Sequence, residues 1–167
     1  MPEVTGSNRP SIVGSSLQVW RSQDLIDWEY LGVPFTMDLG YWADIMPEKF
    51  RSTPREDWKL WAPEIYFFDN RWFLVHTSPS PVRRGANLAI TQTENLEGPY
   101  MHPMKESMRN KHDPSIFLDD DGTFYLLWEN TWIAPIKKGF SGFSAEPVRI
   151  DPAGTRPGPD GKPISHI

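Results

Sequence analysis

The stretch "DPSIFLDDDGTFYLLW", residues 113–128, has a near copy earlier in the chain, "APEIYFFDNRWFLVH", residues 62–76. In each stretch a residue before proline leads into an apolar run, and a polar turn separates that run from a second one. Asp, Asn and Gly at the turns supply the backbone conformations that tight hairpins need. Both stretches therefore predict hairpins, with strands at about 64–68 and 72–77 in the first and at about 115–118 and 123–128 in the second.

A second pair of segments repeats beside the hairpins. The segment "LQVWRSQDLIDWEY", residues 17–30, is similar to "LAITQTENLEGPY", residues 88–100, and each predicts a strand, a polar loop and another strand. Residues 132–137 and 147–150 can take the same part in the second half of the chain. The expected strands then fall into three units: the last two strands of one unit at 15–35, and four strands each at 63–104 and 114–150.

The spacing of these units indicates the fold class. Pro63 and Pro114 are about 51 residues apart, which is in the range of propeller blades. A four-stranded antiparallel sheet cannot bury both of its faces alone, and stacking blades around an axis solves this problem. We therefore expect an all-β chain whose 167 residues are part of a single β-propeller domain. The expected parts are a blade remnant at about 12–38 and blades at about 61–104 and 113–151.

About two and a half blades are fewer than the four or more that close a propeller, so the sequence is expected to be incomplete at both ends. The open blade edges and faces that result predict self-association. The alternative fold is a compact β-sandwich of about ten strands.

The composition limits the classes of partner. Hydrophobic residues make up 38% of the chain, which is enough for a core, and 17 prolines with 12 glycines argue against long helices. The net charge of −5, without a cluster of Lys and Arg, argues against a nucleic acid partner. No apolar run reaches the roughly 18 residues of a membrane helix. The chain has no cysteine for disulfides or thiolate metal sites, and its first residues do not resemble a signal peptide.

Asp113 is the candidate catalytic carboxylate. It stands at the head of a strand that would line the propeller axis, and its counterpart in the repeat is Ala62, so the acid is not part of the repeated pattern. The following proline favours an extended backbone at Asp113, which would hold the carboxylate in place. An ordinary Asp-Pro turn explains the residue equally well. The acids at 119–121 indicate a solvated hairpin tip, because a calcium loop needs ligands at alternate positions and a distal Glu.

Candidate substrate-binding residues lie around the same strand heads. Trp61 and Glu64 occupy the head of the earlier hairpin, where an indole could stack on a sugar ring and a carboxylate could accept hydrogen bonds from its hydroxyls. Trp128 and His112 are further candidates, with core packing and a structural role as their respective alternatives. The histidines show no metal-ligand spacing, so no metal or other cofactor is expected from the residues.

Four segments in order resemble glycoside hydrolase family 43: "SSLQVWRSQDLIDWEYLG", "WAPEIYFFDNRWFLVHTS", "TQTENLEGPY" and "DPSIFLDDDGTFYLLW". The resemblance covers most of residues 15–150. It implies a five-bladed β-propeller and an inverting glycosidase for β-xylosides, α-L-arabinofuranosides, arabinans or galactans of plant walls. It also implies an extracellular or periplasmic location, and it allows a calcium ion near the axis, for which no ligand set can be identified here.

The resemblance assigns three acids, of which one maps onto this chain. An Asp on the first blade is the general base and would precede residues 5–7. A Glu in an E-G-P-like motif is the general acid and would follow residue 167. The Asp of the D-P-S motif raises the pKa of the acid and orients it, and this is Asp113. "LEGPY" at 96–100 contains a similar motif but belongs to an outer strand before Asp113, so Glu97 is not assigned. The chain alone is therefore expected to be inactive.

Two other functions are compatible with the residues. The related five-bladed fructan and sucrose hydrolases carry Arg before the Asp and a Glu-Cys pair, whereas Lys111 and His112 precede Asp113 here and Cys is absent. A non-enzymatic carbohydrate-binding β-domain would use Trp61 and its neighbours as a stacking platform.

Overall fold

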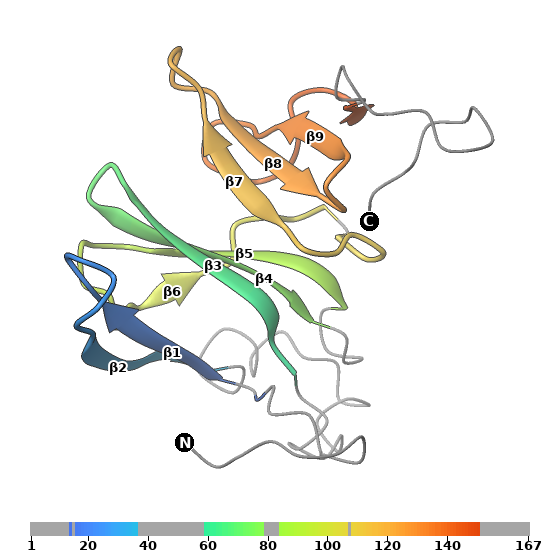
Figure 1. Cartoon of the computed structure of the whole chain (residues 1–167). Helices are drawn as coiled ribbons and strands as arrows, with labels where there is room; N and C mark the ends of the chain where they lie inside the picture. Colours follow the sequence, from blue (N-terminus) through green and yellow to red (C-terminus); the bar gives the residue numbers. More distant parts are fainter. Residues whose placement is uncertain (1–13, 15, 37–58, 79–83, 107, 151–167) are drawn as a thin grey trace, which may run out of the picture.

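The computed structural model describes residues 14, 16–36, 59–78, 84–106 and 108–150, and this part of the chain forms ten β-strands and no helix. The strands lie in three antiparallel sheets that follow one another along the chain (Figure 1). The first sheet contains β1 (Ser16–Arg21) and β2 (Glu29–Thr36). The second contains β3 (Trp61–Phe68), β4 (Arg71–Ser78), β5 (Gly85–Thr91) and β6 (Tyr100–Met101). The third contains β7 (Ser115–Leu118), β8 (Phe124–Trp128), β9 (Trp132–Pro135) and β10 (Val148–Arg149).

Each four-stranded sheet is a simple meander, with orders β3-β4-β5-β6 and β7-β8-β9-β10. Two such sheets preceded by a two-stranded one are what the repeat predicts for two blades and the last strands of another. The predicted fold class, part of a β-propeller, is confirmed, and the alternative of a single β-sandwich is wrong. Within the described residues, no helix is long and apolar enough to cross a membrane.

The predicted hairpins form because their turns carry suitable residues. Asp69 and Asn70 connect β3 to β4 with φ angles of 51° and 55°, the two positive values of a type I′ turn that matches the twist of paired strands. The β7–β8 tip closes with the Asp119 amide donating to the Thr123 carbonyl at 2.9 Å. Gly122 in this tip adopts a φ of 84°. Both hairpins therefore lie where the sequence predicts them.

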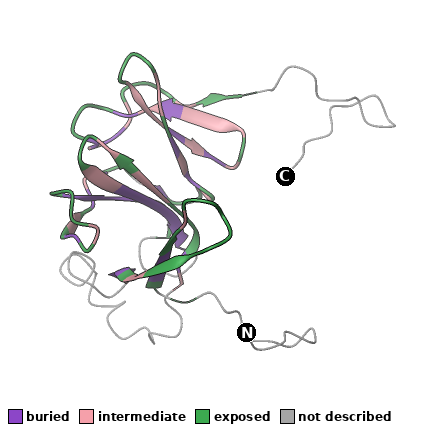
Figure 2. Ribbon diagram, turned by 60° about the vertical axis from the view of Figure 1, so that its left-hand side comes forward, coloured by how far each residue is buried: buried purple, intermediate pink, exposed green. Residues whose placement is uncertain are grey.

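The two central strands of the second sheet, β4 and β5, are buried on both faces. Successive side chains of a strand point to opposite faces, and on β4 the side chains of Phe73 and Val75 pack with the third sheet. Leu74, between them, packs with the first sheet. Every residue of β5 is buried, and so is β4 after its first two residues, which gives the purple strands of Figure 2, whereas β1 is mainly exposed.

Two apolar clusters hold the sheets together. The larger one joins the second and third sheets, and Phe73 lies within it, with ring centroids 5.3 Å from Phe124 and 5.2 Å from Phe140. The smaller one joins the first and second sheets. Its members are Leu17, Val19, Phe35, Leu60, Leu74 and Ala89.

The strands β1 and β3 begin at the same end of the molecule, because the Leu60 amide donates to the Gly14 carbonyl at 2.9 Å. The β1–β2 turn and the β3–β4 turn therefore lie at the opposite end, as Figure 1 shows. This arrangement separates the strand heads, where the candidate residues lie, from the hairpin tips.

We expect Phe73→Ala to destabilise the chain by about 3–5 kcal/mol, because the substitution leaves a cavity between two sheets. Phe117→Ala is the matched control, since its ring on β7 is 48% exposed whereas Phe73 is fully buried, and it should cost much less. Urea unfolding followed by tryptophan fluorescence measures both variants. Similar losses in the two would contradict the assignment of Phe73 to the core.

Self-association of the chain remains a prediction, and the first sheet offers a surface for it. Trp20 and Tyr30 are both about half exposed and lie side by side, with ring centroids 4.7 Å apart. In sedimentation experiments we expect concentration-dependent association that Trp20→Ser weakens. Ile26→Ser, which removes an exposed apolar side chain at the turn, should change it less. A monomer at every concentration would contradict the prediction.

Candidate active site

The heads of β3 and β7 border a cavity of about 350 Å³ between the second and third sheets. Carboxylates reach it from both strands, Glu64 from β3 and Asp113 from just before β7. The β8–β9 hairpin closes another side. The full lining is Ala62, Glu64, Asp113, Pro114, Ser115, Leu127, Trp128 and Asn130.

The backbone at Asp113 is not extended as the proline rule predicts. Its φ is 49°, in the left-handed region, and its amide donates to Oγ1 of the buried Thr77 at 2.7 Å. The expectation is wrong: this strand head does not follow the local preference of a residue before proline, and the bond to Thr77 of the neighbouring sheet forms in the bent conformation. A non-glycine residue in this region stores strain that its surroundings must offset.

The same conformation occurs at the equivalent position of the preceding sheet. Ala62, which stands before Pro63, has a φ of 43°. The bent backbone is therefore a property of the repeated unit and not of the acid. What the third sheet adds at this position is the carboxylate of Asp113.

Glu64 is held by a neighbour on its own strand. The hydroxyl of Tyr66 donates to the Glu64 carboxylate, and the Tyr66 oxygen is also 2.9 Å from Oγ of Ser115 in the other sheet. Burial raises the pKa of the Tyr66 phenol, and the hydrogen bond to Glu64 raises it further. Tyr66, Ser115 and Thr77 did not emerge from the sequence as site residues. The sequence does contain one indication that Tyr66 lies near Glu64. The two residues are two positions apart in a strand, so their side chains point to the same face.

The other predicted binding residues lie in three different settings. Trp61 is 44% exposed at the start of β3 and is outside the cavity lining. His112 is half buried, and its carbonyl accepts a hydrogen bond from the Glu129 amide at 2.9 Å. Trp128 borders the cavity but is only 5% exposed, because it packs in the larger apolar cluster. Sugar binding by these residues remains a prediction.

The acids at the β7–β8 tip have structural roles. Oδ1 of Asp119 accepts from the Asp120 amide, and Oδ1 of Asp121 accepts from the Thr123 amide, each at 2.8 Å. The bond from the Thr123 amide lowers the pKa of Asp121. Glu97 lies in the loop before the outer strand β6, with its amide bonded to Oδ1 of Asn95. Among the described residues no group of three His, Asp or Glu could hold a metal ion.

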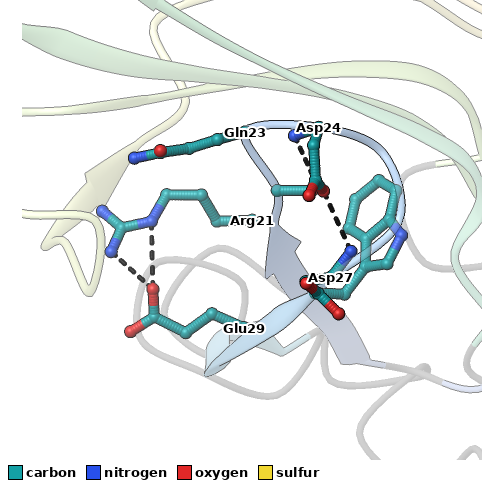
Figure 3. A pocket seen from close by; sticks show the side chains of 7 residues that line it. Arg21, Gln23, Asp24, Asp27 and Glu29 are labelled. Carbon is teal, nitrogen blue, oxygen red and sulfur yellow. Dashed lines mark hydrogen bonds and ion pairs between the residues drawn. The ribbon is translucent and has the colours of Figure 1, made fainter.

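A second cavity, of about 520 Å³, lies at the β1–β2 turn, at the other end of the strands (Figure 3). Its charged groups mainly serve the hairpin itself. Arg21 pairs with Glu29 at 2.5 Å, and Oδ1 of Asp24 accepts from the amides of Ile26 and Asp27. These backbone bonds lower the pKa of Asp24. The cavity at the strand heads is therefore the better candidate.

Residues 5–156, most of the chain and all of the candidate cavity, match the sequence model of the family described as glycosyl hydrolases family 43. The chain belongs to glycosyl hydrolase family 43. This membership agrees with the resemblance of the four segments and separates the chain from the fructan and sucrose hydrolases.

Curated relatives of this family 43 chain include a putative beta-xylosidase of Escherichia coli K12, 28% identical over 116 residues. That alignment covers 67% of the chain and 20% of the relative. Extracellular endo-alpha-(1->5)-L-arabinanase 1 of Bacillus subtilis is 21% identical over 123 residues, with 70% of the chain and 36% of the relative covered. The chain thus spans about a fifth to a third of the length of these relatives.

Solved structures share the fold of the family 43 chain. The endo-arabinase from Bacteroides thetaiotaomicron superimposes with a TM-score of 0.62 at 20% identity, over 86% of this chain and 50% of that one. A thermostable family-43 glycoside hydrolase gives a TM-score of 0.58 at 18% identity, over 86% and 48% of the two chains.

The left-handed backbone at Asp113 predicts an unusual order of stabilities. Asp113→Gly should be more stable than Asp113→Ala by about 1 kcal/mol, because Gly adopts a positive φ without steric cost. At Ser115, the first residue of β7, we expect the reverse order by roughly 0.5–1 kcal/mol, because Gly weakens a strand. Urea unfolding of the four variants tests both differences. The same order at both positions would argue against strain at Asp113.

Proposed function

We propose that this chain is part of the catalytic domain of an inverting glycosidase that cleaves xylose- or arabinose-containing plant-wall polysaccharides. The observation that carries the proposal is the Asp113 carboxylate, which borders a cavity between two blades in the region matched to family 43. The choice of sugar is supported by the names of the relatives, which include a xylosidase/arabinosidase of Humicola insolens besides the xylosidase and the arabinanase.

Inversion requires two carboxyl groups with different protonation states. One protonates the leaving oxygen while the other activates a water molecule on the opposite face of the sugar, at a separation of about 6.5–9.5 Å. The pKa of the acid has to be raised toward the working pH, and a nearby carboxylate does this through like-charge repulsion. We assign this third role to Asp113, and we assign the base and the acid to none of the described residues.

The remaining candidates would bind the sugar. Glu64 presents a carboxylate to the cavity, where it can accept hydrogen bonds from hydroxyl groups. Trp128, which is buried, borders the same cavity. Trp61 and His112 lie beyond the cavity lining. We therefore expect them to contact the neighbouring sugar units of a longer oligosaccharide.

Calorimetry with xylotriose and arabinotriose tests the proposal on the chain itself. We expect binding that Asp113→Asn weakens by about 10-fold, because a neutral amide oxygen accepts a hydrogen bond from a sugar hydroxyl more weakly than a carboxylate does. Asp120→Asn at the hairpin tip removes the same charge away from the cavity and should leave the affinity unchanged. We also expect little or no turnover of aryl xylosides or aryl arabinofuranosides.

The other outcomes discriminate between functions. Sugar binding that Asp113→Asn does not affect would favour a non-enzymatic carbohydrate-binding domain. Clear turnover that Asp113→Ala abolishes would support a glycosidase but would overturn the expectation that the chain alone is inactive. No binding of either oligosaccharide would count against the proposed sugar class.

A further inference from the structure

The Tyr66 hydroxyl connects the two strand heads that border the cavity. It lies between the Glu64 carboxylate on β3 and Ser115 Oγ at the start of β7, a residue 49 positions away in sequence. The ring below it stacks on Phe68 with centroids 5.6 Å apart and packs against the larger apolar cluster. The hydroxyl is therefore held at a fixed place behind the cavity wall.

A count of protons fixes the direction of both hydrogen bonds. A phenol has one proton to donate, and a carboxylate can only accept. The proton of Tyr66 is therefore directed to the Glu64 carboxylate. The contact between Tyr66 and Ser115 then needs a proton from Ser115, because two oxygen atoms this close share one.

We propose that Tyr66 sets the hydrogen-bond polarity of the cavity wall formed by the heads of β3 and β7. Because the Ser115 hydroxyl donates its proton to Tyr66, only its lone pairs face the cavity, and they act as acceptors. Glu64, Ser115 and Asp113 then present acceptors only, and this side of the cavity binds ligand groups that donate. If the proposed function holds, these groups are the hydroxyls of a pentose.

Two observations favour this polarity and this class of ligand. Burial keeps the pKa of Tyr66 above its usual value, so the phenol stays protonated and able to donate at neutral pH. A cation would also suit an acceptor wall, but the described residues contain no group of three carboxylates or histidines that could hold a metal ion. Donors for the ligand's own acceptors are available from the Asn130 amide on the β8–β9 side.

The direction of the Tyr66 bond can be measured by NMR without any sugar. In the chain labelled at Tyr and Ser, we expect the Tyr66 hydroxyl proton at low field, as for a hydrogen bond to a carboxylate. Glu64→Gln should move this resonance strongly upfield, whereas Ser115→Ala should move it little. Tyr100, whose hydroxyl donates to the Leu96 carbonyl at 2.8 Å, provides a control resonance that neither variant should shift.

The opposite pattern, sensitivity to Ser115→Ala and not to Glu64→Gln, would overturn the proposal. If exchange with water hides the hydroxyl proton, titration of the Tyr66 ring carbon gives a second measurement. Glu64→Gln should then lower the pKa of Tyr66, because the carboxylate that raises it has been removed. An unchanged pKa would also overturn the proposal.

The ligand is tested separately, by calorimetry with xylotriose, arabinotriose and their monodeoxyfluoro analogues, in which fluorine cannot donate. Wild-type chain should bind at least one fluoro analogue about 10-fold more weakly than the parent sugar. In Tyr66→Phe the Ser115 proton can face the cavity. This variant should therefore bind the parent sugar more weakly and show a smaller difference in affinity between the parent sugar and its fluoro analogue. Tyr125→Phe, a phenol outside the cavity lining, is the matched control.

The two experiments separate the proposal from the proposed function. If neither sugar binds while the NMR shifts are as expected, the polarity of the wall stands and the pentose ligand is wrong. If the sugars bind but Tyr66→Phe leaves the discrimination unchanged, Tyr66 does not control specificity. Tight calcium binding that Glu64→Gln removes would show that a cation is the ligand of the wall.

Discussion

The apolar side chains of β4 and β5 have to be buried on both faces of one sheet, and the rest of the structure depends on this requirement. Phe73 and Val75 need the third sheet on one face, and Leu74 needs the first sheet on the other. A single four-stranded sheet could not bury both of its faces. Burial of apolar surface contributes roughly 25 cal/mol per Å² to stability, and an uncovered face would lose this contribution. Stacking of blades is thus a consequence of how one strand is patterned.

The same packing creates the cavity. When the third sheet lies against the second, the heads of β3 and β7 meet at the edge of the larger apolar cluster, where polar groups reach across. The Thr77 hydroxyl accepts a hydrogen bond from the Asp113 amide, and the hydroxyls of Tyr66 and Ser115 are in contact. Both polar contacts join residues of different sheets, so the positions of the two cavity carboxylates depend on the core beneath them.

The sequence predicted the features that depend on neighbouring residues. The hairpin at Asp69 and Asn70 follows from local turn chemistry, and the blade pattern follows from the repeat. The backbone at Asp113 was predicted wrongly because the preference before proline is local, whereas the bend recurs at Ala62 and so belongs to the repeated unit. The link between Tyr66 and Ser115 could not be found, since it joins positions that only the fold brings together. Glu64 and Asp113 were chosen as candidates because the repeat placed both at strand heads, and both line the same cavity.

The left-handed residue before proline at the head of both inner strands bears on how such a site can arise. Ala62 and Asp113 occupy equivalent places with nearly the same φ, so the bend was present in the repeated unit regardless of the side chain. An acid introduced at this place needs no new backbone geometry, only a change of side chain at a position that already borders the cavity between the two sheets. The two equivalent positions differ in side chain alone, and one carboxylate makes the head of the third sheet chemically different from that of the second.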